Sequence, residues 1–166
     1  MDIRAALQAE HSKRNTTAIA EYIGGDAKRF AELMKIFFEG EYRPTQRAAW
    51  PMSVCIEKHP ELITSYLNKL VDQLTRNDVH DAVKRNVVRL LQYIEIPKRL
   101  SGKIYSICVD LIDDISEPVA VRAFALTVAI KIAGNEPSLL DELRLIAKAH
   151  LSLTSAAFHK RARVLF

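Results

Sequence analysis

An arginine recurs at nearly constant spacing in this chain, and a proline follows each copy at a similar distance. The arginines are Arg47, Arg85 and Arg122, which are 38 and 37 residues apart. The prolines are Pro60, Pro97 and Pro137, which are 37 and 40 residues apart. A weaker copy of the unit runs from Arg14 to Met34. This self-similarity indicates stacked units that bury their apolar faces against one another, because one unit cannot do so alone.

Apolar residues recur three, four and seven positions apart along the chain, as in Phe30, Leu33, Met34 and Phe37. This period places an apolar stripe on one face of a helix. No segment alternates with period two over a useful length, so we expect no sheet. The expected helices are 2–10, 13–23, 26–39, 44–58, 60–74, 79–94, 98–114, 118–133, 137–151 and 155–164. The short turns between them predict antiparallel neighbours.

Glycine and small polar residues mark the expected helix boundaries. Gly24-Gly25 and Gly134-Asn135 are expected to end helices, the first in left-handed geometry. The expected N-caps are Asp26, Asn77 or Asp78, Ser116, and Thr154 or Ser155.

Pro51 lies within RAAWPMSVCIEKHPEL, residues 47–62, and leaves two interpretations open. In the first, one helix runs through Pro51 and is kinked there, since proline removes a helical hydrogen bond, and Trp50 packs into the space that the kink opens. In the second, the helix begins at Pro51 and residues 44–49 form an irregular lead-in. We favour the kinked helix.

The composition is that of a folded, mildly basic chain. It has 166 residues, 49% of them hydrophobic, and a net charge of +4 from 24 basic and 20 acidic residues. This charge permits a polyanionic partner without implying one. No apolar run approaches the roughly 20 residues of a membrane helix, and the amphipathic start is not typical of a secretory signal. Cys55 and Cys108 lie among apolar neighbours, which favours reduced core thiols and a cytoplasmic location.

The recurring arginines follow valine in Val83-Lys84-Arg85 and Val121-Arg122. With helix pairs of this period, the chain resembles the HEAT and armadillo-like helical repeat proteins over about residues 12–151. The segments RAAWP, HPEL, KRNVVRLLQ and EPVAVRAFALTV are similar to small bacterial HEAT-like proteins without an established activity. The resemblance implies an all-α fold, an α–α superhelix of about four antiparallel helix pairs.

We therefore expect a single HEAT-like repeat domain over residues 1–166. Its repeat units are roughly 12–39, 44–74, 79–114 and 118–151, with a terminal capping helix at 155–164. The resemblance also implies an acidic partner upstream of each arginine. The candidates, Glu41, Asp78 and Glu117, lie 6, 7 and 5 residues upstream, so the family spacing is not kept.

Two interpretations of the arginines stay open. As scaffold, they form a ladder of salt bridges and hydrogen bonds to helix ends. As a binding row on the concave face, they hold phosphates or a carboxylate-rich peptide. The candidate binding residues are Arg47, Trp50, Arg85, Arg89 and Arg122. Trp50, Tyr93 and Phe124 are aromatic residues of the kind that stack on nucleobases or bind a cation, but large aromatic residues in helical repeats more often lie in the core, which we favour.

The sequence contains few signs of metal binding or catalysis. The five histidines form no metal motif, so no metal or cofactor is expected. The acidic residues Asp110, Asp113, Asp114 and Glu117 are typical of a solvated face. Cys55 and His59 share a helix face, but a buried thiol is a poor nucleophile.

Three classes of function are compatible with these features. The first is a non-catalytic interaction module that binds a protein or peptide on its concave face. The second is a nucleic-acid binding protein related to HEAT-like DNA alkylation repair glycosylases. The third is an all-helical enzyme such as a lyase, whose signature loop this sequence lacks; no catalytic residue is proposed. The expected partner is a protein or peptide, with nucleic acid as the alternative and no membrane.

Overall fold

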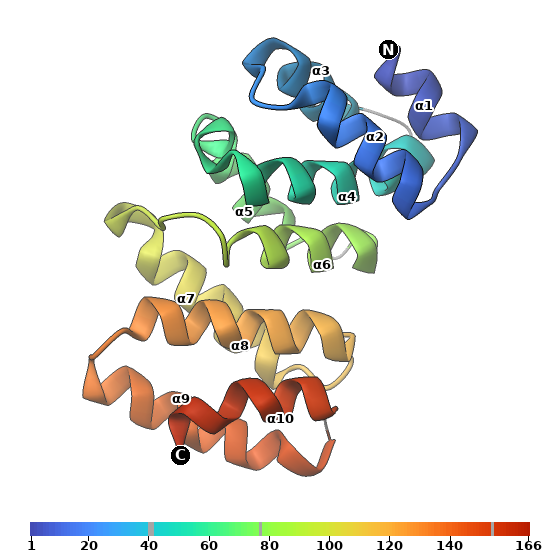
Figure 1. Cartoon of the computed structure of the whole chain (residues 1–166). Coiled ribbons are helices and arrows are strands. Elements are labelled where there is room, and N and C mark those ends of the chain that lie inside the picture. Colours follow the sequence, from blue (N-terminus) through green and yellow to red (C-terminus); the bar gives the residue numbers. More distant parts are fainter. Residues whose placement is uncertain (40–41, 77, 154) are drawn as a thin grey trace. The chain divides into compact units, whose positions relative to one another are not determined.

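The computed structural model describes residues 1–39, 42–76, 78–153 and 155–166, and these residues form helices and turns without a strand. The α-helices are α1 (Ile3–Ala9), α2 (Lys13–Ile23), α3 (Ala27–Glu39), α4 (Tyr42–Lys58), α5 (Leu67–Gln73), α6 (Asp81–Leu90), α7 (Lys98–Asp113), α8 (Val119–Ala133), α9 (Pro137–His150) and α10 (Ala156–Ala162), as Figure 1 shows. Short 3-10 helices are η1 (Pro60–Ile63), η2 (Leu151–Leu153) and η3 (Arg163–Leu165). The expected all-helical fold is confirmed.

The chain divides into two compact units, Met1–Ile94 and Glu95–Phe166. The expectation of one continuous repeat domain stays a prediction. In the first unit α4 is central, because α1, α2, α3 and α6 all pack against it. Helices α2, α4 and α6 follow one another in Figure 1 and form one layer of this unit.

The middle of α4 shows why it can pack on several sides. Ala48, Ala49, Met52 and Ile56 are all 0% exposed, and the two alanines let neighbouring helices approach closely. The helix continues through Pro51, so the interpretation in which it begins at Pro51 is wrong. Tertiary packing on both sides offsets the hydrogen bond that proline removes.

In the second unit α8 has the central place, packing against α7, α9 and α10. Its sequence VAVRAFALTVAIKIA is apolar around most of the helix. A helix of this kind needs cover on several sides. The last helix, α10, supplies part of that cover through Phe158, which is 0% exposed.

The expected helix at 60–74 is the largest boundary error. The structure has η1, a turn and then α5 in its place. Successive amides bond three residues back, as Leu62 N does to His59 O (3.2 Å) and Tyr66 N does to Ile63 O (2.8 Å). The hydroxyl of Thr64 also donates to Glu61 O (3.0 Å), and such side-chain bonds compete with a regular helix.

Several expected helix ends are confirmed. Gly24 and Gly134 have φ values of 51° and 55° and follow the ends of α2 and α8. Glycine adopts this region without the steric cost that a Cβ would bring. Asp26 Oδ1 accepts from the amides of Lys28 (2.8 Å) and Arg29 (3.2 Å) and so caps α3. These two bonds lower the pKa of the Asp26 carboxyl.

The expected caps of α6 and α8 are wrong, whereas the expected cap position of α10 is confirmed at Ser155. The N-cap of α6 is His80 and not Asp78, which bonds to Arg76 instead; Asn77 lies outside the described residues. Ser116 donates to Asp114, and Pro118 precedes α8 without a side-chain cap. Ser155 is the N-cap of α10 but makes no side-chain cap bond, and Thr154 lies outside the described residues.

His80→Ala is expected to lower the free energy of unfolding by about 1 kcal/mol, because Nδ1 of His80 accepts from the Ala82 amide (3.0 Å) and caps α6. His80→Asn restores a capping acceptor and should recover most of the loss. Urea unfolding of the three proteins measures the effect. Equal stability of the alanine variant and the parent chain would show that this cap contributes nothing.

Candidate functional site

Arg47 lies early in α4 and holds the end of α1. Its Nη1 donates to Leu7 O (2.9 Å) and Gln8 O (2.8 Å). The last carbonyls of a helix have no helical partner and carry its negative partial charge. A half-buried arginine at this place therefore satisfies α1 and attaches it to α4.

Arg122 does the same in the second unit. Its Nε donates to Ile112 O (3.0 Å), in the last turn of α7. The side chain is 1% exposed, and its guanidinium carbon lies 5.9 Å from the ring centroid of Phe158. This burial corrects the expected surface role of Arg122, because a buried guanidinium presents nothing to a partner in solution.

The scaffold interpretation is thus confirmed for Arg47 and Arg122 in one of its two forms, hydrogen bonds to helix ends. The acidic ladder is not seen for either residue within the described parts of the chain. Of its candidates, Glu41 lies outside those parts, and Asp78 pairs with Arg76 (2.5 Å). Glu117 precedes Pro118 and is half-buried.

Arg85 differs from these two arginines. It is exposed, and its side chain makes no hydrogen bond or ion pair with any residue that the structure describes. The position within the repeat explains this difference. Lys84 and Arg122 each follow a buried valine, Val83 and Val121, and each lies four residues after the N-cap of its helix. Arg85 is therefore one position beyond the scaffold position and is exposed on α6. The shared valine was the sequence signal for this register.

Arg89 lies one turn after Arg85 on the same helix and connects α6 to α4. Its Nη2 bonds to Oε2 of Glu57 (2.9 Å), and Nη1 lies 3.4 Å from Oγ of Ser53. The guanidinium carbon lies 5.9 Å from the ring centroid of Tyr93, which is 41% exposed. Because this ion pair is partly solvated, it adds little stability.

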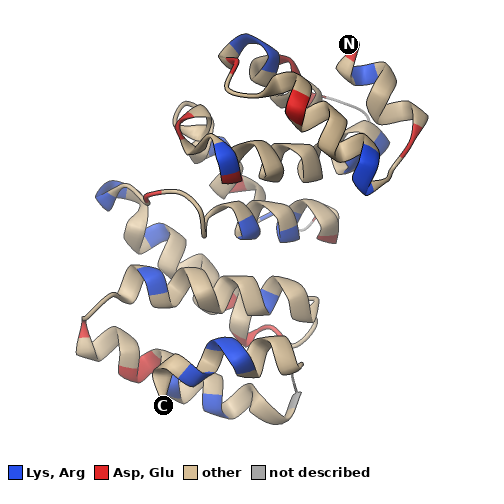
Figure 2. Ribbon diagram, in the orientation of Figure 1, with Lys and Arg blue, Asp and Glu red and all other residues tan. Residues whose placement is uncertain are grey.

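Trp50 is half-buried, and its ring meets the His11 ring edge-on with centroids 5.8 Å apart. One turn later on α4, Oγ of buried Ser53 lies 3.3 Å from Oδ1 of Asn86 and joins α4 to α6. We use "α4–α6 face" for the surface formed by Trp50 and Glu57 on α4, Arg85 and Arg89 on α6, and Tyr93 just after α6. Figure 2 shows the basic positions along α6. Phe124 belongs to the second unit, where the Arg161 guanidinium lies 5.2 Å from its ring.

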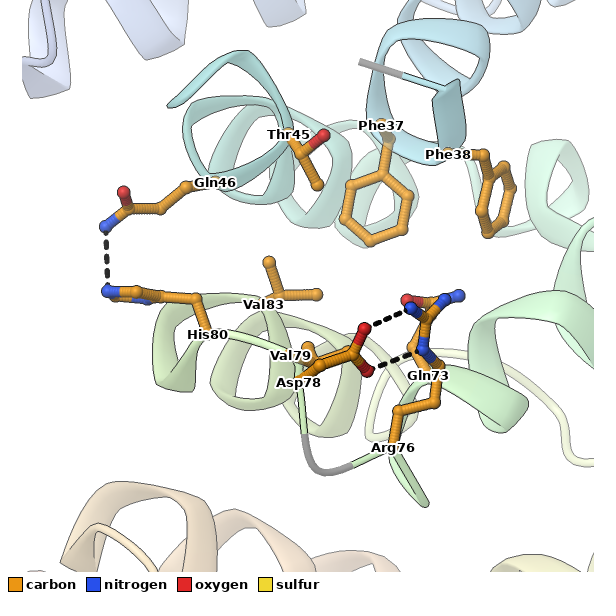
Figure 3. A pocket seen from close by; sticks show the side chains of 10 residues that line it. All are labelled: Phe37, Phe38, Thr45, Gln46, Gln73, Arg76, Asp78, Val79, His80 and Val83. Carbon is orange, nitrogen blue, oxygen red and sulfur yellow. Dashed lines mark hydrogen bonds and ion pairs between the residues drawn. The ribbon is translucent and has the colours of Figure 1, made fainter. Parts of the chain in front are cut away.

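A separate pocket of about 250 Å³ lies in the first unit where α3, α4, α5 and the start of α6 meet (Figure 3). It is lined by Phe37, Phe38, Thr45, Gln46, Gln73, Arg76, Asp78, Val79, His80 and Val83. The Gln46 amide lies 3.4 Å from Nε2 of His80 on one side, and the Arg76–Asp78 pair closes another. Sequence reasoning missed this pocket, because its lining comes from four separate segments without a shared motif.

The model of the HEAT repeat domain matches residues 3–163 of this chain. The chain belongs to the HEAT repeat domain family. HEAT repeats generally mediate protein interactions. No curated protein and no solved structure matches the chain.

Both cysteine thiols lie in the core. Burial raises the pKa of the Cys55 thiol to about 12, and that of Cys108 to about 12 as well. A thiol of this kind stays protonated and unreactive near neutral pH, so the Cys55–His59 pair is no nucleophile.

The acidic residues also have structural neighbours. Asp113 lies 2.9 Å from Nε2 of buried His150, and Asp114 accepts from Ser116. Within the described parts of the chain, no three His, Cys, Asp or Glu side chains gather as they would around a metal ion. The helices described there are also too short or too polar to span a bilayer.

Proposed function

We propose that this HEAT repeat protein is a non-catalytic interaction module that binds a carboxylate-rich segment of a protein partner. The proposed site is the α4–α6 face, as part of the concave face that stacked helix pairs present. Within it, Arg85 and Arg89 are the anionic contacts and Trp50 is the apolar contact. A cytoplasmic location belongs to the same proposal and is supported by the two buried free thiols.

The observation that carries the proposal is the isolated charge of Arg85. The other two arginines of the repeat series satisfy carbonyls at helix ends, whereas the Arg85 side chain has no partner among the described residues. Its fork of donors matches a carboxylate in two parallel hydrogen bonds. Residues four apart on a helix are neighbours, so Arg89 adds its positive charge on the same side.

Arg89 limits which partners suit this face. Glu57 already occupies Nη2 of Arg89, so an incoming carboxylate meets one unpaired arginine and one paired arginine. The face therefore suits a segment in which a few carboxylates lie beside an apolar side chain. The edge of Trp50 offers the apolar contact, since tryptophan and arginine dominate the binding energy of many interfaces.

Arg85→Glu is expected to weaken binding of a fluorescein-labelled octaglutamate peptide by about tenfold or more in about 50 mM salt, because the reversal replaces attraction by repulsion. Lys28→Glu is the matched control: it changes the net charge equally from an exposed position on α3. Fluorescence anisotropy measures both. Equal losses in the two variants would mean that net charge alone drives binding and would contradict the proposal.

The same titration with labelled duplex DNA distinguishes the peptide proposal from the nucleic-acid alternative. Contacts to several phosphates produce a loss of affinity by orders of magnitude between about 50 and about 200 mM salt. We expect the parent protein to bind the peptide more tightly than DNA at the higher salt. Tighter DNA binding with a steep salt dependence would support the alternative and contradict the peptide proposal.

A further inference from the structure

The pocket of Figure 3 has an apolar wall and a polar wall. Phe37 and Val83, which are 2% and 3% exposed, provide the apolar wall together with Phe38. Gln46 and Gln73 provide neutral amides on the polar side. The Gln73 side chain is half-buried and makes no hydrogen bond with any residue in the described parts of the chain. A half-buried amide without a partner among the described residues is available to a ligand group that donates or accepts a hydrogen bond.

Charge in the pocket is balanced. Arg76 donates from Nε to Oδ1 of Asp78 (2.9 Å) and from Nη2 to Oδ2 (2.5 Å). These bonds lower the pKa of Asp78 and raise that of Arg76. No other Asp, Glu, Lys or Arg is among the described lining residues. A charged ligand would lose its hydration without meeting an unpaired charge of opposite sign among the lining residues. The pocket therefore favours an uncharged group.

The size of the pocket suits one side chain. About 250 Å³ is below the roughly 300–1,000 Å³ of sites that enclose a whole small molecule. The occupant is therefore more compact than a nucleotide or another large cofactor.

The apolar wall is aromatic and already has ring contacts. The rings of Phe37 and Phe38 meet edge-on with centroids 5.1 Å apart, and Phe38 stacks on Tyr66 at 6.4 Å. A further ring entering beside Phe38 extends this cluster in the offset or edge-on geometry that aromatic pairs prefer. A ring that carries a hydroxyl group at its far end also forms a hydrogen bond with an amide on the polar wall.

We infer that this pocket is a recognition subsite for the phenol side chain of a tyrosine in a bound peptide. The ring packs against Phe37, Phe38 and Val83, and the hydroxyl bonds to the Gln73 amide. The inference rests on the proposed function only in that the tyrosine belongs to a peptide partner. The pocket itself is defined by residues that do not belong to the α4–α6 face.

The test uses N-acetyl-L-tyrosinamide, titrated into the full ¹⁵N-labelled chain and followed by amide chemical shifts. We expect saturable shifts at Phe38, Gln73 and Val79 with a dissociation constant in the millimolar range, as befits a probe of this size. N-acetyl-L-phenylalaninamide should bind about threefold to tenfold more weakly, because it lacks the hydroxyl. Equal affinity of the two probes, or no saturable shift at these residues, would overturn the inference.

Two variants and one control make the test specific. Gln73→Ala should abolish the preference for the tyrosine probe while retaining the phenylalanine probe, and Val79→Trp should fill the pocket and abolish both. Gln8→Ala makes the same chemical change at an exposed position outside the pocket and should change neither affinity. An unchanged preference in Gln73→Ala would overturn the role of that amide.

Failure here and failure of the proposed function are distinguishable. The probe carries no carboxylate and needs no partner protein, whereas the octaglutamate peptide carries no ring. Binding of the peptide without binding of the tyrosine probe would leave the α4–α6 face as the interaction site and remove the phenol pocket.

Discussion

Arg122→Ala is expected to lower the free energy of unfolding by about 3 kcal/mol or more. The substitution leaves Ile112 O without its donor, removes the cation beside Phe158 and opens a cavity in the second unit. Large-to-small changes at buried sites cost about 2–5 kcal/mol, and an unsatisfied buried carbonyl adds to that cost. Urea unfolding followed by circular dichroism measures the loss.

Arg85→Ala is the matched control for this experiment. It makes the same change at an exposed position, so its effect should stay within about 0.5 kcal/mol. Arg122→Met, which keeps most of the volume but not the hydrogen bond, should fall between the two. Equal stability of the two alanine variants would contradict the division of the arginines into scaffold and surface.

The second large effect is a loss of stability at alkaline pH. Burial raises the pKa of Cys55 and Cys108 from 9.0 to about 12. The unfolded chain therefore loses these protons at lower pH than the folded chain. The free energy of unfolding keeps its full value below about pH 9, and it falls as the pH rises toward 12 because deprotonation of the thiols favours the unfolded chain. Between pH 8 and pH 10 the loss is on the order of 1–2 kcal/mol for each thiol.

Urea unfolding under reducing conditions at pH 8 and pH 10 measures this loss. The double variant Cys55→Ala, Cys108→Ala should lose roughly 3 kcal/mol less than the parent chain over this interval. Tyr105, whose pKa is also raised, is present in both proteins and contributes equally to both. The same pH dependence in the double variant would show that the thiols are not the cause.

Much of the fold follows from the sequence because the helical period is strong. The expected helix 13–23 coincides with α2, and 98–114 exceeds α7 by one residue. The period continues through Thr64 and Ser65, however, and gives no sign that local side-chain bonds break the helix there. Aspartate and asparagine are the more usual caps and stand just before His80, but the adjacent pair His80-Asp81 at a helix start favours capping over metal coordination, and His80 is the N-cap of α6.

The candidate site was less predictable, since burial and register depend on packing. Arg47, Arg85 and Arg122 look equivalent by spacing, yet one residue of offset separates Arg85 from the scaffold position that Lys84 occupies in the repeat. Arg122 is buried because α10 returns over α8, a contact between residues far apart in the sequence. The pocket beside Phe38 likewise exists only once four segments have come together.

The central claim is that the α4–α6 face, led by Arg85, is the interaction surface. Titration of the octaglutamate peptide into the ¹⁵N-labelled chain, with amide and indole shifts recorded, tests it most directly. The account predicts saturable shifts at the Trp50 indole N–H and along Asp81–Leu90. Shifts spread evenly over exposed basic residues such as Lys28 and Lys160, with α6 unaffected, would contradict it.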